Sequence, residues 1–127
     1  MGIFKSNKCQ LIGVSPVIPV PDVSSAVSFY CDQLGFDRDF VVGEPPDHGS
    51  VTRGRAGIQF TLPGKQFSST DYPGWIYLFV ENIDALANEY SQRGVTFTQQ
   101  LGTRDHGMRE FEITELNGLR LRFGQYV

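Results

Sequence analysis

The sequence is poor in the residues that build metal centres and redox sites. Its 127 residues include two cysteines and two histidines, and Cys9 and Cys31 form no metal-binding or redox spacing. We therefore expect two free thiols, as in a reducing cytoplasm. The sequence also has no nucleophile motif, no phosphate-binding loop and no Cys/His catalytic set. None of the enzyme classes that short motifs reveal is indicated.

Long apolar runs and a strong charge of either sign are missing too. No segment is apolar for long enough to span a bilayer, and the chain does not open with the basic and apolar regions of a signal peptide. The net charge of −3 favours neither nucleic acid nor an anionic membrane as a partner. With 40% hydrophobic and 20% charged residues, the composition is globular. We expect a cytoplasmic protein that binds neither nucleic acid nor membranes.

The sequence does contain an internal repeat. The stretch "VPDVSSAVSFYCDQLGF" from Val20 matches "VENIDALANEYSQRGVTF" from Val80, with equivalent residues 60 positions apart. An Asp-His-Gly triplet also occurs twice, at 47–49 and 105–107. Such repeats indicate two copies of one structural module. Within a single domain, 1–127, we place the first module at about 13–63, a connector at about 64–74 and the second module at about 75–127.

Each copy predicts one helix. Asp22 and Asn82 are good N-caps, because their side chains can accept hydrogen bonds from the free amides of a first helical turn. Gly35 and Gly94 suit the left-handed residue that ends a helix. Between cap and stop, apolar residues recur at the spacing of one helical face. The two stripes are Val23, Ala26, Val27 and Tyr30, and Ile83, Leu86, Ala87 and Tyr90.

Alternating segments around the two helices predict strands. They lie at Val14–Val20, Arg38–Val42, Ser50–Arg53, Ile58–Leu62, Trp75–Val80, Thr96–Leu101, Met108–Thr114 and Leu119–Phe123. The order is β-α-β-β-β in each module, which predicts an α+β fold. Pro16 and Pro19 favour an edge position or a bulge for the first strand. Asn117-Gly118 predicts a tight turn between the last two strands.

Three stretches that together span both modules resemble a known superfamily. They are "PVIPVPDVSSAVSFYCDQLGFDRDFV", "LFVENIDALANEY" and "REFEITELNGLRLRF". In them the chain resembles the vicinal oxygen chelate superfamily of glyoxalases, extradiol dioxygenases and bleomycin-resistance proteins, and most closely the bleomycin-resistance branch. The resemblance implies two βαβββ modules that form a curved, half-open mixed sheet around a cleft, with the helices outside. One such fold hosts many chemistries, so function depends on the residues of the cleft.

Strand alternation predicts which side chains line this cleft. Successive residues of a strand face opposite sides, so inward-facing Leu119, Leu121 and Phe123 leave Arg120 and Arg122 toward the cleft. The same alternation turns Ile58, Phe60, Leu62, Ile76, Leu78, Val80, Phe111 and Ile113 inward. The resemblance adds Phe40, near the drug site, and His106, which borders it. The candidate ligand-binding residues are Phe40, Gln59, Thr61, Trp75, Tyr77, Phe79, His106, Glu110, Glu112, Arg120 and Arg122.

The resemblance also allows a test for a metal centre. Metal-dependent members place His, Glu or Gln ligands at four cleft positions, which fall on Ser15, Gln59, Trp75 and Arg122 in this sequence. Only Gln59 retains a metal-binding side chain, and the guanidinium of Arg122 would place positive charge beside an ion. The sequence therefore predicts no bound metal and no other cofactor.

Two alternatives remain open for the charged side chains of the last strands. Arg120 and Arg122 could pair with Glu110 and Glu112 across the neighbouring strand. Alternatively, one arginine could remain free to hold an anionic or carbonyl-bearing ligand. Both can hold together, because an arginine fixed by a carboxylate is also preorganised for a ligand.

The histidines and aromatic residues allow two interpretations as well. His48 and His106, each in an Asp-His-Gly turn, are polar turn residues, or His106 is a contact at the rim of the ligand site. Trp75, Tyr77 and Phe79 either pack against other protein groups or stack on a ligand.

We expect from this sequence a metal-free, homodimeric binding protein with no catalytic residues. It would sequester a flat, partly polar small molecule, an antibiotic being one candidate. One alternative is a lyase, isomerase or dioxygenase-like enzyme of the same superfamily with altered active-site residues, using Glu110 or His106 as a base. A second alternative is a dimeric regulatory or structural protein without a small ligand.

Overall fold

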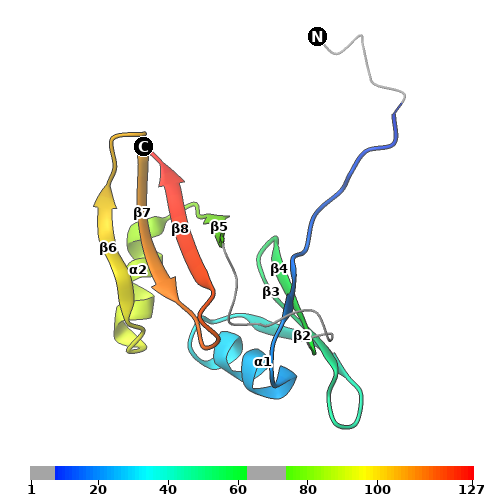
Figure 1. Ribbon diagram of the computed structural model, residues 1–127. Helices are drawn as coiled ribbons and strands as arrows, with labels where there is room; N and C mark the ends of the chain where they lie inside the picture. Colours follow the sequence, from blue (N-terminus) through cyan, green and yellow to red (C-terminus); the bar gives the residue numbers. More distant parts are fainter. Residues whose placement is uncertain (1–7, 63–73) are drawn as a thin grey trace.

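The computed structural model describes residues 8–62 and 74–127, which form two four-stranded sheets and two helices (Figure 1). The chain runs through β1 (Val17–Pro19), α1 (Val23–Asp32), β2 (Asp37–Val42), β3 (His48–Arg53), β4 (Ala56–Thr61), β5 (Trp75–Phe79), α2 (Ile83–Gln92), β6 (Phe97–Thr103), β7 (Met108–Thr114) and β8 (Arg120–Tyr126). The β-α-β-β-β order occurs twice, which confirms the predicted α+β class. The predicted connector, 64–74, lies outside the described residues apart from Gly74.

The two sheets share one topology. Their strand orders are β1-β4-β3-β2 and β5-β8-β7-β6, so β1 and β5 are edge strands. Each edge strand runs parallel to the last strand of its module. The edge position of β1 is the one that Pro16 and Pro19 predicted, because proline has no amide hydrogen to give to a second neighbour. The strand is shorter than the predicted Val14–Val20, and the side chain of Val14 is 91% exposed.

The two helices begin and end as predicted. The carboxylate of Asp22 accepts a hydrogen bond from the amide of Ser24, and the side chain of Asn82 accepts one from the amide of Ala85. The left-handed glycines that follow them have φ angles of +71° and +80°; they are Gly35 and Gly94. Each predicted apolar stripe is buried, with the residues Val23, Ala26, Val27 and Tyr30 in α1 and Ile83, Leu86, Ala87 and Tyr90 in α2.

Each helix packs on one face of its own sheet. Helix α1 contacts β2, β3 and β4, and α2 contacts β7 and β8; Figure 1 shows α2 against one side of the second sheet. We call the opposite side of each sheet its open face. No helix within the described ranges is long and apolar enough to cross a lipid bilayer.

The two modules share a core and are joined by hydrogen bonds between buried groups. Side chains of both modules form one continuous cluster of buried apolar residues. The hydroxyl of Tyr30 donates to the carboxylate of Glu115 at 3.2 Å, and the hydroxyl of Tyr90 donates to the carbonyl oxygen of Leu34 at 2.8 Å. Each helix tyrosine therefore links its own module to the other one.

Most strand boundaries differ from the predicted ones by one to three residues, and those at Leu62 and Leu119 concern residues that were assigned to the inward face. Leu62 was expected to face inward, but it lies beyond the end of β4 and is 41% exposed, because strand alternation no longer applies there. The last strand begins at Arg120 rather than Leu119 and continues to Tyr126. Leu119 is buried within the turn, where its carbonyl oxygen accepts from the amide of Glu115.

Candidate functional site

The strand register of the second sheet gathers most of the predicted cleft residues on its open face. Tyr77 of β5, Arg122 of β8 and Glu112 of β7 form one row across three strands. The two flanking rows are Phe79, Gly124 and Glu110, and Trp75, Arg120 and Thr114. Because side chains of one row share a face, aromatic groups at the edge strand lie beside charged groups further into the sheet.

A pair of buried carboxylates forms the floor of this face. Glu110 and Glu112 are 1% and 6% exposed. Glu112 accepts a hydrogen bond from Arg122 at 2.9 Å through one oxygen and from the hydroxyl of Thr98 at 3.0 Å through the other. Arg122 also approaches Glu110 at 3.8 Å. The structure therefore assigns Arg122 to its neighbouring carboxylates, as one of the two sequence interpretations expected.

Glu110 is surrounded by proton donors. The hydroxyl of Tyr77 donates to it at 2.7 Å, and the side-chain nitrogens of His106 and Arg104 lie at 3.4 Å and 3.9 Å. Burial and the hydrogen bond to Glu110 raise the pKa of Tyr77 to about 12. The hydroxyl of Tyr77 thus keeps its proton and remains a donor in neutral solution.

Close approach of Tyr77 to the sheet depends on a glycine. Gly124 stands between Phe79 and Glu110 in its row, where any side chain would point to the open face. A Cβ atom at Gly124 would overlap the hydroxyl and ring of Tyr77. The missing side chain therefore opens the path along which Tyr77 reaches the carboxylate.

Trp75 and two arginines form a cationic aromatic surface on the same face. The guanidinium carbons of Arg120 and Arg122 lie 4.9 Å and 5.0 Å from the centre of the Trp75 ring, a geometry in which cation and π system attract. Trp75 is 48% exposed. The side chain of Arg120 makes no hydrogen bond or ion pair with any residue that the structure describes. The two arginines thus differ, because only Arg122 is held by carboxylates.

Further aromatic rings extend this surface along the edge. The ring centres of Tyr77 and Phe79 are 5.1 Å apart, and those of Phe79 and Tyr126 are 5.7 Å apart in a stacked pair. Phe79 and Tyr126 are largely exposed. An exposed row of rings of this kind is typical of surfaces that bind flat ligands or protein partners.

The remaining predicted residues lie on the open face of the first sheet. His48 is the first residue of β3 rather than a turn residue, and its Nε2 lies 2.7 Å from the side-chain oxygen of Gln59. Phe40 stacks on the His48 ring at 5.5 Å, and Thr61 is the strand partner of His48. The candidate residues are therefore divided between two sheets, with Phe40, Gln59 and Thr61 on the first.

The four positions implied for a metal do not make a metal site. Ser15 donates to the carbonyl oxygen of Gly57 at 3.3 Å, Gln59 is engaged by His48, and Arg122 is bound to Glu112. Within 8–62 and 74–127, no group of three or more His, Cys, Asp or Glu side chains could hold an ion. The donor set does not fit a divalent cation.

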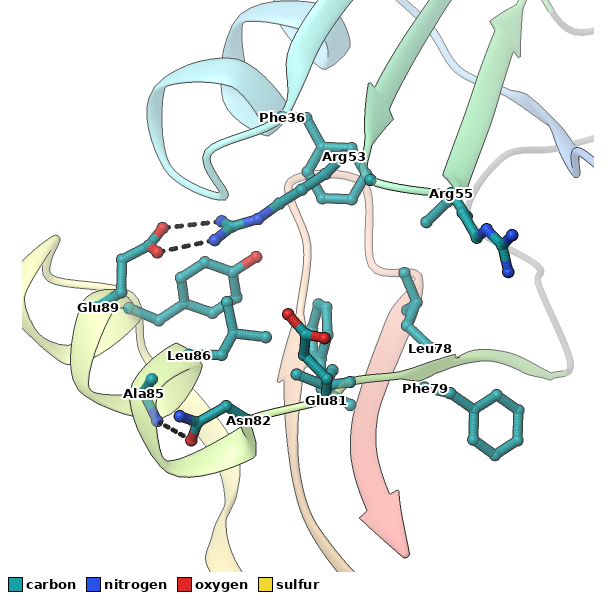
Figure 2. A pocket seen from close by; sticks show the side chains of 15 residues that line it. Phe36, Arg53, Arg55, Leu78, Phe79, Glu81, Asn82, Ala85, Leu86 and Glu89 are labelled. Carbon is teal, nitrogen blue, oxygen red and sulfur yellow. Dashed lines mark hydrogen bonds and ion pairs between the residues drawn. The ribbon is translucent and has the colours of Figure 1, made fainter.

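The structure also contains a pocket that strand alternation did not predict (Figure 2). It has a volume of about 570 Å³ and lies between the β3–β4 turn and the edge formed by β5 and the start of α2. Its lining residues are Phe36, Arg53, Gly54, Arg55, Ala56, Leu78, Phe79, Val80, Glu81, Asn82, Ala85, Leu86, Glu89, Tyr90 and Phe123. Of these, only Phe79 was a predicted site residue.

One ion pair spans the modules beside this pocket. Both terminal nitrogens of Arg53 donate to the two carboxylate oxygens of Glu89 at 2.8 Å, as Figure 2 shows. The hydrogen bond from Arg53 lowers the pKa of Glu89. No sequence pattern predicts this pair, because its partners come from different modules and share no motif. Arg104, which directly follows β6, was not predicted either; its Nε lies 3.9 Å from Glu110 of the same module.

Comparisons with known proteins agree with this architecture. The model of the Glyoxalase/Bleomycin resistance protein/Dioxygenase superfamily matches residues 13–123. No curated protein matches the chain in sequence.

Several solved structures are similar over nearly their whole length. The bleomycin-binding protein of Streptomyces verticillus, solved with copper(II)-bleomycin, is 26% identical, with a TM-score of 0.73 over 91% of this chain and 97% of its own. A glyoxalase-related enzyme from Clostridium phytofermentans is 22% identical, with a TM-score of 0.77 over 96% and 100%. TioX from Micromonospora sp. ML1 is 16% identical, with a TM-score of 0.75 over 91% and 98%. The last two likenesses concern the fold alone.

Proposed function

Because the chain belongs to the Glyoxalase/Bleomycin resistance protein/Dioxygenase superfamily, we propose that it is a metal-free binding protein that sequesters a flat small molecule. The binding surface is the open face of the second sheet, with Trp75 as its principal contact. Similarity to a protein solved with copper(II)-bleomycin supports a small-molecule ligand and makes an antibiotic one candidate.

The observation that carries this proposal is the half-exposed ring of Trp75 beside a floor of paired charges. The carboxylates of this floor are already bonded to Arg122, Tyr77 and Thr98, so they are held in place and shielded from water. A large exposed ring on such a rigid base offers stacking energy to a ligand at little cost in side-chain entropy. The proposed mechanism is reversible binding without covalent change to the ligand.

Thermal unfolding tests this function. A ligand that binds only the native state raises the melting temperature, so a panel of flat aromatic compounds, including copper(II)-bleomycin, should contain compounds that stabilise the purified protein. Replacement Trp75→Ala should abolish this stabilisation, whereas Leu116→Ala, at an exposed apolar side chain in the β7–β8 turn, should leave it intact. If a compound stabilises the parent protein, Trp75→Ala and Leu116→Ala equally, it binds away from Trp75 and the proposed surface is wrong.

The absence of a metal is a separate part of the proposal. Elemental analysis of protein purified without added metal should find less than about one ion of Zn, Fe, Ni or Mn per ten chains. One tightly held ion per chain would contradict it. Loss of that ion on replacement of Gln59 would point to the superfamily's metal positions.

A homodimer is also proposed. Leu11 and Ile12 are 95% and 99% exposed, and Val14 is similarly exposed. The apolar side chains of the segment before β1 therefore pack little against the described part of their own chain. Both β1 and β5 are edge strands whose outer side pairs with no strand of the described residues, and a second copy could cover these edges and the exposed segment. A monomeric mass by light scattering at micromolar concentration would remove this part of the proposal.

A second function is favoured by one contact. His106 is mostly exposed and lies 3.4 Å from the buried carboxylate of Glu110, an arrangement in which the carboxylate can orient an imidazole base. A lyase or isomerase that removes a proton from its ligand would use this pair. Such an enzyme would lose turnover in His106→Gln while retaining ligand binding, whereas a sequestering protein would release its ligand chemically unchanged.

A further inference from the structure

We propose that the ligand of the second sheet is a planar aromatic anion, whose acidic group is held by Arg120 and whose ring packs on Trp75. This inference rests on the proposed function, because it names the chemical class of ligand for that same surface. It follows from the unequal roles of the two arginines and from the local balance of charge.

Among the residues that the structure describes, the balance of charge on the open face is positive. Arg104, Arg120 and Arg122 supply three guanidinium groups there, against the two carboxylates of Glu110 and Glu112. One positive charge is left over, although the whole chain has a net charge of −3. A local charge of opposite sign to that of the whole molecule attracts anions to this place in particular.

The surplus charge belongs to Arg120. Arg122 and Arg104 both face the buried carboxylates, whereas the guanidinium of Arg120 contacts only the Trp75 ring among the described residues. A half-buried guanidinium beside an indole is less well hydrated than a free one, and its planar fork of N–H groups suits the two oxygens of a carboxylate. Arg104 Nε and Arg122 Nε also lack a hydrogen-bond partner, but both atoms are buried. Arg120, which is partly exposed, is therefore the described guanidinium on this face whose unused donors a ligand can reach.

The same geometry disfavours a cationic ligand. Glu110 and Glu112 are nearly inaccessible and already accept from Tyr77, Thr98 and Arg122. A cation would have to displace an arginine or lie beside Arg120 without a counter-charge, and like charges in a partly desolvated site repel strongly. The exposed groups of this face are aromatic rings and a cation, which together suit an aromatic acid.

Trp75 provides a direct measurement, because it is the only tryptophan of the chain. In the 15N-labelled full-length protein, its indole N–H gives one resolved signal that reports on this face alone. We would titrate three probes of matched shape, 2-naphthoate, 2-naphthamide and 2-naphthylmethylammonium, and follow that signal. We expect the anion to bind at least about tenfold more tightly than the amide, and the cation to bind weakest.

Variants then test the role of Arg120. Arg120→Gln should remove the preference, weakening 2-naphthoate by about tenfold or more while leaving 2-naphthamide unchanged. Arg120→Lys should restore part of it, since the charge remains but the fork is lost. Arg38→Gln is the matched control, because Arg38 is an exposed arginine of β2 in the other module and its removal changes the net charge equally.

The outcomes separate this inference from the proposed function. If the amide or the ammonium compound binds as tightly as the anion, or if Arg120→Gln binds all three as the parent protein does, the anion inference is wrong and the binding function stands. If none of the probes moves the Trp75 signal while another region of the spectrum responds, the second open face is not the ligand site, and both fail. If Arg38→Gln loses the preference for the anion as fully as Arg120→Gln does, the preference comes from the net charge of the protein. The proposed role of Arg120 is then wrong.

Discussion

The two modules are alike where they face their helices and different on their open faces. On the helix side, Tyr30 and Tyr90 occupy equivalent positions and both reach into the other module. On the open side, Gln59 of the first sheet is equivalent to Arg122 of the second. Gln59 pairs with Val17 of β1 and Arg122 pairs with Tyr77 of β5, and these two partners are 60 positions apart, as in the repeat. The repeat has therefore kept its packing, while its open faces have diverged.

This divergence separates a neutral face from an ionic one. Gln59 meets the ring of His48 through one short contact, whereas Arg122 bridges two buried carboxylates. Removing one partner of a buried ion pair costs more stability than removing one partner of a neutral hydrogen bond. The remaining carboxylate is then buried without a counter-charge and cannot be hydrated. The same substitution at equivalent positions should consequently have unequal effects.

The largest difference is expected for Arg122→Leu against Gln59→Leu. Leucine suits a strand at both positions, but Arg122→Leu leaves Glu112 with Thr98 as its remaining described donor. The free energy of unfolding should fall by about 3–5 kcal/mol for Arg122→Leu and by about 1 kcal/mol for Gln59→Leu. Urea unfolding of both variants measures these two losses of stability. Equal losses would show that the paired charges around Arg122 stabilise the fold no more than the neutral contact of Gln59 does.

A smaller effect is expected where the second face relies on close packing. Gly124→Ala places a methyl group where the Tyr77 hydroxyl lies, so Tyr77 should swing away from Glu110 at a cost of about 1–3 kcal/mol. The equivalent residue of the first sheet is Thr61, and Thr61→Ala should change stability by less than about 0.5 kcal/mol. If Gly124→Ala is as stable as the parent protein and its Tyr77 titrates unchanged, then the contact with Glu110 is not tight.

The helix tyrosines test the side on which the modules agree. Tyr30→Phe removes a hydrogen bond to the buried carboxylate of Glu115, and should cost about 1.5–3 kcal/mol. Tyr90→Phe should cost about 1 kcal/mol, since the carbonyl oxygen of Leu34 still accepts from Arg53 at 2.9 Å. Paired thermal melts would rank the two, and the reverse order would mean that the carboxylate is better satisfied by its backbone donors than we infer.

The architecture could be predicted from the sequence because it depends on periodicity and caps, which are local. Both helices, their caps and their glycine stops are confirmed, as are the edge position of β1 and the inward faces of β4, β7 and β8. Errors fell at ends of strands, as at Val14 and Leu62, where alternation gives no information about where pairing stops.

The site was less predictable, because its contacts join distant parts of the chain. Alternation placed Glu110 and Arg122 on one face, but it could not say which arginine pairs with a carboxylate. That choice depends on how far each arginine side chain extends from its strand. Both guanidinium groups also lie at similar distances from the Trp75 ring, so contact with Trp75 does not distinguish them. Arg104 and the Arg53–Glu89 pair went unpredicted for the same reason.

Glu115 is the source of a predicted dependence of stability on pH, and it has no counterpart among the buried polar groups described in the first module. It lies at the β7–β8 turn, where one carboxylate oxygen accepts from the amides of Asn117 and Leu119 and the other from Tyr30. Burial outweighs these hydrogen bonds and raises the pKa of Glu115. The native state therefore holds this proton more tightly than the unfolded chain does.

The sign of the pH dependence follows from that difference. Stabilisation by a raised carboxyl pKa is complete below the unfolded value, near 4.5, and is lost as the pH rises through the folded value. Glu115→Gln cannot ionise, yet its amide oxygen can still accept from Asn117 and Leu119 while its NH2 group donates to the Tyr30 oxygen. The variant should match the parent protein near about pH 4 and be the more stable of the two near about pH 7. Other carboxylates are common to both proteins, so their contributions cancel in the difference between urea midpoints. Glu81→Gln, at an exposed site, controls for the loss of one carboxyl group. If the stability of the parent protein instead rises relative to that of the variant as the pH increases, the turn amides stabilise the ionised form of Glu115. Their hydrogen bonds would then outweigh the effect of burial on its pKa.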